Sequence, residues 1–126
     1  MHSMVSLPPD MLRGFVDIDY QREMAFVALH GDGSNEAEVG VGRYLPCPDG
    51  ESCEFAIVIA DSWQKRGLGM RLMQMLIGHA RARGFKRMTA QVLPHNLAML
   101  GLCRKLDFEM SPWTVGGDVR LASKLL

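Results

Sequence analysis

The spacing of apolar positions along this chain predicts a mixed α/β fold. An apolar run over residues 24–29 is followed by a dense turn signal at 31–35 and a second strand pattern at 38–44, so these two strands should form a hairpin. After a Pro- and Gly-rich loop, residues 53–60 contain the apolar run Phe-Ala-Ile-Val-Ile, which is typical of a central buried strand. We therefore expect an antiparallel meander of three strands.

The second half of the chain has the pattern of a helix, a parallel strand and a second helix. Residues 68–80 carry apolar side chains at helical spacing on one face, which predicts an amphipathic helix. The alternating residues 88–92 then predict a strand that runs parallel to the preceding one, because a crossover of this length favours that direction. Asn96 can cap the second helix, whose apolar positions continue over 99–106, and residues 119–126 predict a closing strand.

The N-terminal region predicts a further helix. Residues 8–10, Pro-Pro-Asp, are typical of a helix start, and Met11, Phe15 and Ile18 would share one face. We expect this helix to end near Asp19.

Composition indicates one soluble domain over residues 1–126. The 14 Lys and Arg residues balance the 14 Asp and Glu residues without long runs of either sign, which argues against a nucleic-acid or membrane partner. The odd number of cysteines, 3, argues against a disulfide framework and a metal site. Neither an apolar run of roughly 20 residues nor a signal-peptide pattern is present, so we expect a cytoplasmic protein.

The segment with the clearest chemical meaning is the glycine turn at residues 64–69, Gln-Lys-Arg-Gly-Leu-Gly, between the central strand and the long helix. Its glycines allow a tight turn, and the first N–H groups of the helix lack partners, which suits a diphosphate. The spacing is that of neither a P-loop nor a dinucleotide fingerprint. Turn chemistry without any ligand explains the same residues.

Two segments together resemble the GNAT N-acetyltransferases. Residues 64–69 resemble the family's Q/R-x-x-G-x-G/A acetyl-CoA loop, and residues 96–108 resemble its second signature, an Asn-led helix that ends in a Lys-x-Gly-Phe-like sequence. The resemblance implies the GNAT fold and acetyl-CoA as co-substrate, with no metal. It also implies that the chain lacks the family's first strand and first helix, so that the fold is shortened at its N-terminus. Either the chain is a fragment of a larger protein, or a partner chain completes the fold in a homodimer.

Residues 18–25, residues 53–56 and Asn96 followed by Met99-Leu100 are similar to the acetyltransferase domain of bacterial protein lysine acetyltransferases. This narrower resemblance implies acetylation of a protein lysine in a ternary complex. Acetylation of a small amine, and a CoA-binding regulatory module without catalysis, remain as alternatives.

The family resemblance also implies the contacts of acetyl-CoA. The pantetheine arm would bond to the backbone of the central strand, the pyrophosphate to the amides of the glycine turn, and the helix-capping asparagine to the arm. The expected contact residues are Ile57, Val58, Ile59, Gln64, Lys65, Arg66, Gly67, Leu68, Gly69, Met70 and Asn96.

Glu54 is the expected general base, since a lysine amine with a reference pKa of about 10.4 must lose a proton before it attacks. Strand alternation puts it on one face with Ala56 and Val58; an exposed strand-end glutamate is the alternative. For the acceptor entrance we expect three neighbours of the first hairpin strand, although an ion-paired helix end explains them equally well: Asp19, Tyr20 and Glu23.

Two positions depart from the family pattern. Cys103 stands where many members have a tyrosine that protonates the leaving thiolate, and its place on the apolar stripe favours packing over catalysis. Asp107 replaces a glycine at the helix exit, where a positive φ is usual and aspartate is tolerated.

Overall fold

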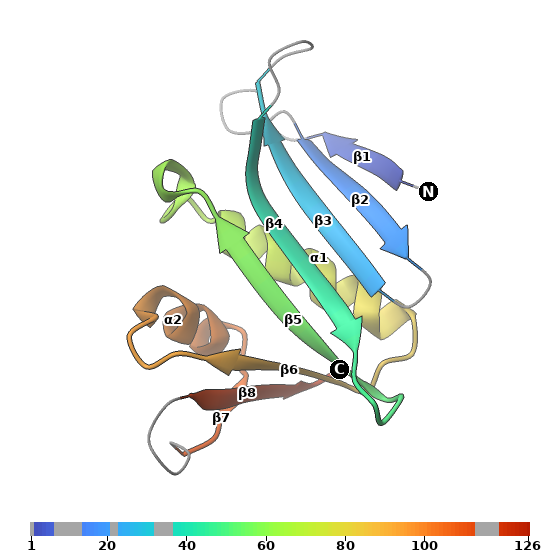
Figure 1. Cartoon of the computed structure of the whole chain (residues 1–126), viewed down its shortest axis with the longest axis vertical. Helices are drawn as coiled ribbons and strands as arrows, with labels where there is room; N and C mark the ends of the chain where they lie inside the picture. The colour runs from blue at the N-terminus through green and yellow to red at the C-terminus, as the bar shows by residue number, and fades with distance from the viewer. Residues whose placement is uncertain (1, 7–13, 21–22, 32–36, 113–118) are drawn as a thin grey trace.

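The structure is a computed structural model that describes residues 2–6, 14–20, 23–31, 37–112 and 119–126, with backbone alone for the first two ranges. The described strands form one sheet in the order β1-β2-β3-β4-β5-β6-β8-β7 (Figure 1). Their bounds are β1 His2–Ser6, β2 Gly14–Tyr20, β3 Glu23–His30, β4 Ala37–Pro46, β5 Ser52–Ile59, β6 Arg87–Val92, β7 Glu109–Met110 and β8 Arg120–Leu125. Two α-helices, α1 (Leu68–Ala82) and α2 (Leu97–Lys105), and a short 3-10 helix, η2 (Asp61–Trp63), complete the described elements.

The predicted topology is confirmed. Strands β3, β4 and β5 pair in antiparallel fashion as a meander, and β5 pairs in parallel with β6 through the crossover that contains α1. Strand β8 returns antiparallel to β6 and closes the sheet. The fold is therefore a mixed α/β sheet with two helices.

The predicted helix over residues 8–19 is wrong where the structure describes it. Residues Gly14–Tyr20 form strand β2, which pairs with β3 over seven residue pairs. The aromatic and β-branched residues of this segment, Phe15, Val16, Ile18 and Tyr20, favour a strand, and the edge of β3 offers backbone partners that an isolated short helix lacks. Residues 7–13 lie outside the described part of the chain. The expected loss of a first strand is not confirmed, since both β1 and β2 precede β3.

Helix α1 covers one face of β3, β4 and β5, as Figure 1 shows. Its buried stripe is the predicted one: Leu68, Leu72, Met73, Leu76, Ile77 and Ala80. Two glycines of β4 allow this close packing, because a Cβ at Gly40 would lie 3.0 Å from Leu68 Cδ2 and one at Gly42 would lie 3.2 Å from Leu72 Cβ. The helix is thereby fixed against the sheet at its first turn.

Further along α1, Tyr44 of β4 is fully buried, and its hydroxyl shares a hydrogen bond of 2.7 Å with His79 Nδ1. This bond satisfies a polar group that would be costly to bury alone.

Neither α1 nor α2 has the length and apolar character that a membrane-spanning helix needs.

Candidate functional site

Strands β5 and β6 separate partway along their length. Their parallel pairing covers Ser52 with Arg87, Cys53 with Met88, and Glu54 with Thr89. Beyond these pairs, in the described strands, β5 is paired with β4 alone and β6 is paired with β8 alone. The edge of β5 that faces β6 therefore has no strand partner over residues 55–59, and its backbone groups are available to a ligand.

The loop after η2 directs the start of α1 toward this open edge. Gly67 is the N-cap residue and has a left-handed φ of 82°, and no side chain caps the first turn. Gln64 Nε2 donates to the carbonyl of Ile59 and to Asp61 Oδ1, both at 3.3 Å, which ties the loop to the end of β5. The first N–H groups of α1 thus remain for an anion, as the glycine turn predicted.

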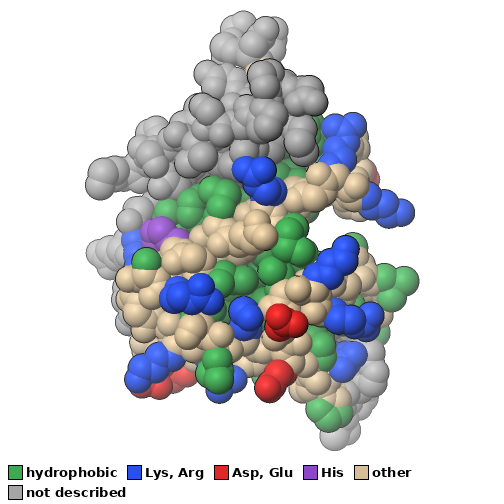
Figure 2. Space-filling model, turned by 180° about the vertical axis from the view of Figure 1, so that it is seen from behind, with side chains coloured by type: hydrophobic (Ala, Val, Ile, Leu, Met, Phe, Trp, Pro, Cys, Tyr) green, Lys and Arg blue, Asp and Glu red, His purple; other side chains and the backbone are tan. Residues whose placement is uncertain are grey.

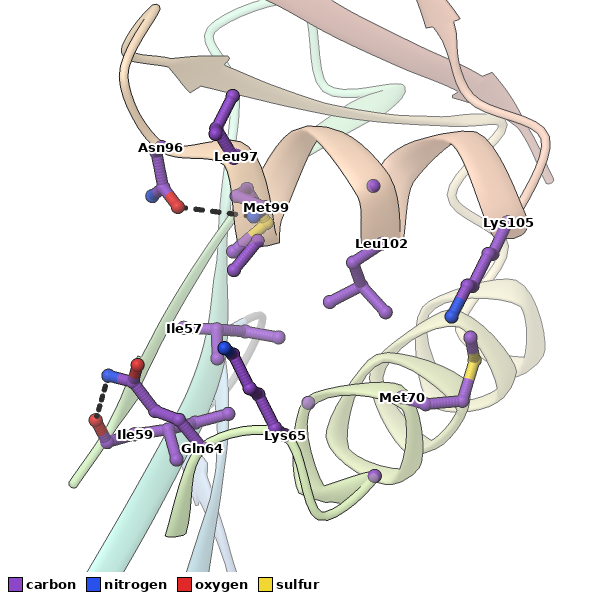
Figure 3. A pocket seen from close by; sticks show the side chains of 14 residues that line it. Ile57, Ile59, Gln64, Lys65, Met70, Asn96, Leu97, Met99, Leu102 and Lys105 are labelled. Atoms are coloured by element: carbon purple, nitrogen blue, oxygen red, sulfur yellow. Dashed lines mark hydrogen bonds between the residues drawn. The ribbon is translucent and has the colours of Figure 1, made fainter. Parts of the chain in front are cut away.

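A cavity of about 490 Å³ lies between β5, this loop and α2. Figure 2 shows the corresponding face of the molecule, hollowed at one side, with hydrophobic side chains in the hollow and Lys and Arg side chains around it. Its size is that of a small-molecule site. The lining residues are Ile57, Ile59, Gln64, Lys65, Gly67, Gly69, Met70, Asn96, Leu97, Ala98, Met99, Gly101, Leu102 and Lys105 (Figure 3).

Gly69 lines the cavity between Ile59 and Leu102. A Cβ at residue 69 would lie 3.2 Å from Ile59 Cδ1 and 3.4 Å from Leu102 Cδ2. Those two side chains belong to β5 and α2, so a larger residue here would fill the space between them. The sequence motif requires a small residue at this position for a steric reason.

Most of the expected acetyl-CoA contacts are brought together in this cavity. They are Ile57, Ile59, Gln64, Lys65, Gly67, Gly69, Met70 and Asn96. Asn96 also caps α2, because its Oδ1 accepts a hydrogen bond of 3.1 Å from the N–H of Met99. The capping prediction is therefore confirmed.

Three of the expected contacts do not line the cavity. The side chain of Val58 is 71% exposed on the opposite face of β5. Leu68, the first residue of α1, is buried between this helix and the sheet. The Arg66 guanidinium lies 4.6 Å from the ring centroid of Trp63, in a cation–π contact. The side chains of these three residues therefore lie outside the cavity.

Sequence reasoning missed the wall that α2 contributes. That wall consists of Leu97, Ala98, Met99, Gly101, Leu102 and Lys105. A signal was present in the spacing, since Leu97, Gly101 and Lys105 follow one another at intervals of four residues and share a face of the helix.

Glu54 lies outside the cavity lining. Its side chain is exposed, and strand alternation directs it to the face opposite Ile57 and Ile59. It is nevertheless the last residue of β5 that pairs with β6, so it lies at the point where the two strands separate.

The expected acceptor residues are only partly described. Glu23 is exposed at the start of β3, and its neighbour Met24 is buried on the face that α1 covers. By alternation Glu23 shares the face of Glu54, two strands away. The side chains of Asp19 and Tyr20 lie outside the described residues.

Cys103 is a packing residue in this structure. Its side chain is 1% exposed, it is not among the lining residues, and burial raises the pKa of its thiol to about 11.

Asp107 has a φ of 64°, as expected for a position usually held by glycine. Among the described residues, no group of three or more His, Cys, Asp or Glu side chains is arranged to hold a metal ion.

Comparison with known proteins agrees with this geometry. Residues 5–108 match the sequence profile described as the Acetyltransferase (GNAT) family. An acetyltransferase of Pseudomonas aeruginosa is 44% identical over 100 residues, which cover 79% of this chain and 54% of that protein. An L-methionine sulfoximine/L-methionine sulfone acetyltransferase of the same species is 41% identical over 58 residues, 46% of this chain and 34% of that protein. The chain spans about half the length of the first of these relatives.

Solved structures share the fold at lower identity. The GNAT domain of S. lividans PAT has a TM-score of 0.70 at 23% identity, over 86% of this chain and 64% of that one. A cAMP-binding acyltransferase from Mycobacterium smegmatis has a TM-score of 0.77 at 19% identity, over 98% of this chain and 47% of that one. At these identities the likeness concerns the fold.

Proposed function

The chain belongs to the GNAT family of acetyltransferases, and on that premise we propose that it transfers the acetyl group of acetyl-CoA to an amine. The observation that carries the proposal is the joint position of three features. The open edge of β5, the uncapped first turn of α1 and the wall of α2 border one cavity. Together they offer backbone partners for an amide-rich arm and N–H donors for a diphosphate.

The cavity lining supports this proposal for two parts of acetyl-CoA, the pantetheine arm and the diphosphate. The amides of the pantetheine arm would bond to the backbone of residues 57–59, between the apolar side chains of Ile59 and Leu102. The diphosphate would accept hydrogen bonds from the first N–H groups of α1, with Lys65 nearby to contribute charge. Because Asn96 Oδ1 is occupied by the N–H of Met99, its amide nitrogen is the group that can donate to the arm.

We propose that the reaction takes place where β5 and β6 separate. The thioester would enter from the cavity side, and the acceptor amine would approach from the face of Glu54. Glu54, directly or through water, accepts a proton from the ammonium group, and the free amine attacks the thioester carbonyl. A C–N bond forms and the C–S bond breaks. The attacking nitrogen, which carries a positive charge after the attack, loses its second proton to solvent, the CoA thiolate leaves and takes a proton from solvent, and Glu54 returns its proton to solvent.

Transition-state stabilisation in this proposal comes from position and backbone donors. The thioester oxygen becomes an oxyanion during attack, and an N–H near Val58 is the proposed donor. Cys103 has no part in the step, since it is buried away from the cavity.

For the acceptor we propose a protein lysine. Its support is the similarity of residues 18–25 and 53–56 to bacterial protein lysine acetyltransferases, and the acidic position of Glu23 on the face of Glu54. A small amine is the second candidate, favoured by the relative that acts on L-methionine sulfoximine and L-methionine sulfone.

One assay tests the function and separates the acceptors. CoA thiol release from acetyl-CoA is followed with lysine-containing peptides, with intact proteins and with small amines that include methionine sulfone. Turnover with peptides or proteins supports the lysine acceptor, and turnover confined to small amines overturns it. Acetyl-CoA binding without turnover on any acceptor would instead indicate a regulatory CoA-binding module.

A further inference from the structure

Arg43 lies on the face of the sheet that carries Glu54. Its two neighbours in β4, Gly42 and Tyr44, are buried on the side of α1. Because side chains alternate along a strand, Arg43 points to the opposite face, and its side chain is exposed there. Figure 1 shows this face toward the viewer, with α1 behind the strands.

The register of the strands places Arg43 close to Glu54. Arg43 is paired with Ala56 of β5, and Glu54 precedes Ala56 by two residues on the same face. Such diagonal neighbours in an antiparallel pair lie roughly 7–8 Å apart. On its other side Arg43 is paired with Ala25 of β3. The two alanines in register with Arg43 have short side chains, which leave room beside it for a group of a ligand.

Arg43 and Glu54 are neighbours that do not pair with each other. Within the part of the chain that the structure describes, neither side chain forms a hydrogen bond or an ion pair. A guanidinium presents a planar fork of N–H donors that matches the two oxygens of a carboxylate. The unused donors of Arg43 therefore suit a carboxylate from outside the chain.

This face thus offers one cation and one anion side by side. In the proposed function, Glu54 accepts a proton from the ammonium group of the acceptor. An acceptor that also carries a carboxylate would bring its positive charge to Glu54 and its negative charge to Arg43, so that both charges meet the opposite sign. An acceptor with an ammonium group alone would be repelled by the guanidinium.

We propose that Arg43 binds a carboxylate of the acceptor and makes this chain prefer acceptors in which a carboxylate lies close to the reacting amine. The inference rests on the proposed function and names the class of acceptor that it uses. On a protein, the carboxylate belongs to an acidic residue next to the acceptor lysine. On a small acceptor, it is the carboxylate of an amino acid. Both present the same group to the guanidinium.

Two matched pairs of acceptors test this preference, with CoA thiol release measured at saturating acetyl-CoA. The first pair is a capped peptide with a glutamate directly before its single lysine, and the same peptide with glutamine in that place. The second pair is Nα-acetyl-lysine and its amide. The members of a pair offer the same ε-amine and differ by one carboxylate. We expect the wild type to have a kcat/KM about fivefold higher for the charged member, since an exposed charge pair contributes up to about that factor.

Arg43→Gln should lose the preference and keep the wild-type kcat/KM for the neutral acceptors. Arg43→Glu should reverse it and favour a third peptide, in which arginine replaces the glutamate before the lysine. The matched control is Arg81→Gln, which removes an exposed guanidinium from the last turn of α1, on the other side of the sheet. This control should keep the preference, because it changes the net charge and not the acceptor face.

The outcomes separate this inference from the proposed function. A preference in the peptide pair alone supports an acidic neighbour of the lysine, and one in the second pair alone supports an amino acid. Equal kcat/KM values within both pairs for the wild type, or a preference that persists in Arg43→Gln, would overturn the carboxylate contact and leave acetyl transfer intact. If the wild type turns over none of these acceptors, the proposed function fails and this inference fails with it. Thermal unfolding verifies that each variant is folded.

Discussion

Glu54 and Thr89 form the last residue pair between β5 and β6 before the two strands separate. The Thr89 hydroxyl also donates to the carbonyl of Cys53 at 3.5 Å, on the paired side of this point. Glu54 is thus held at the junction by backbone pairing, while its side chain remains exposed. A carboxylate at this junction can be reached from the face opposite the cavity.

Glu54→Gln should lower kcat by about a hundredfold, because general-base assistance is lost while the strand pairing remains. The affinity for acetyl-CoA should not change, since Glu54 does not line the cavity. Activity of the variant should rise with pH as the acceptor amine loses its proton without help. Steady-state kinetics over a pH series measures both effects.

Glu38→Gln is the control for this variant. Glu38 is an exposed glutamate near the start of β4, whereas Glu54 is paired with Leu45, near the end of β4. It should behave as the wild type. Retention of full activity by Glu54→Gln would remove this residue from the mechanism.

Gly69→Val should raise the KM for acetyl-CoA by about tenfold, since overpacking costs about 1–3 kcal/mol and the new side chain would occupy the space between Ile59 and Leu102. Gly78→Val is the same change in the same helix, at a position with nothing within 4 Å. It should leave KM unaltered. Equal KM values for both variants would show that residue 69 does not border the bound arm.

The cysteines should differ sharply in reactivity toward a disulfide reagent. Cys47 is partly exposed, whereas Cys53 and Cys103 are buried. Burial raises the pKa of Cys53 to about 12, with a smaller contribution from Cys47, and that of Cys103 to about 11. Near neutral pH we expect one of the 3 thiols to react rapidly and the other two at the rate of unfolding.

The same pKa values give the sign of a pH effect on stability. Each buried thiol holds its proton more tightly in the folded state than in the unfolded state, where the reference value is 9.0. Their contribution is complete below pH 9.0 and is lost as the pH rises toward 11 to 12. Denaturant titrations should therefore show falling stability over that range. A Cys47→Ser variant should lose the rapid thiol reaction and keep the fall in stability, because burial is the larger cause of the raised pKa of Cys53 and the cause named for Cys103.

Asp49 should contribute to stability with the opposite pH dependence. The N–H of Ser52, the N–H of Glu51 and the Ser52 hydroxyl all donate to its carboxylate, and these bonds lower its pKa below the usual 3.8. The ionised form is thus favoured in the folded state, so the contribution is present above pH 3.8 and is lost as the pH falls through the lowered value.

Asp49→Ala should therefore have a lower melting temperature than the wild type at neutral pH, and the difference should shrink in strong acid. Asp49→Asn keeps one acceptor oxygen and should lie between the two. A melting-temperature difference that stays constant down to strong acid would contradict the role of the ionised carboxylate.

The sequence predicted those parts of the fold in which local pattern and tertiary contacts agree. In the apolar face of α1, in the apolar strand β5 and at the Asn96 cap, the local sequence pattern and the tertiary contacts favour the same structure. All three were predicted correctly. The segment from Gly14 to Tyr20 failed because a few residues at helical spacing outweighed its strand-forming side chains, and only the edge of β3 decides between the two. The sequence of residues 14–20 alone does not show that β3 will pair with this segment.

The site was predictable to a similar extent. The motif around Gly67 and Gly69 located one wall, since its geometry is local. The opposite wall depends on how α2 packs across the cavity, and Lys105 enters it through that packing. Strand alternation predicted the face to which Glu54 points. Its place at the point where β5 and β6 separate depends on the pairing of two strands, which the local sequence does not show.

That separation has a consequence for stability. In the described strands, three residue pairs join β5 to β6, and all of them lie at one end of the two strands. A molecule lying along β5 and touching α2 would bridge the two strands where they are apart. Since such a molecule would bind the folded chain and not the unfolded one, the free energy of unfolding should rise with its concentration.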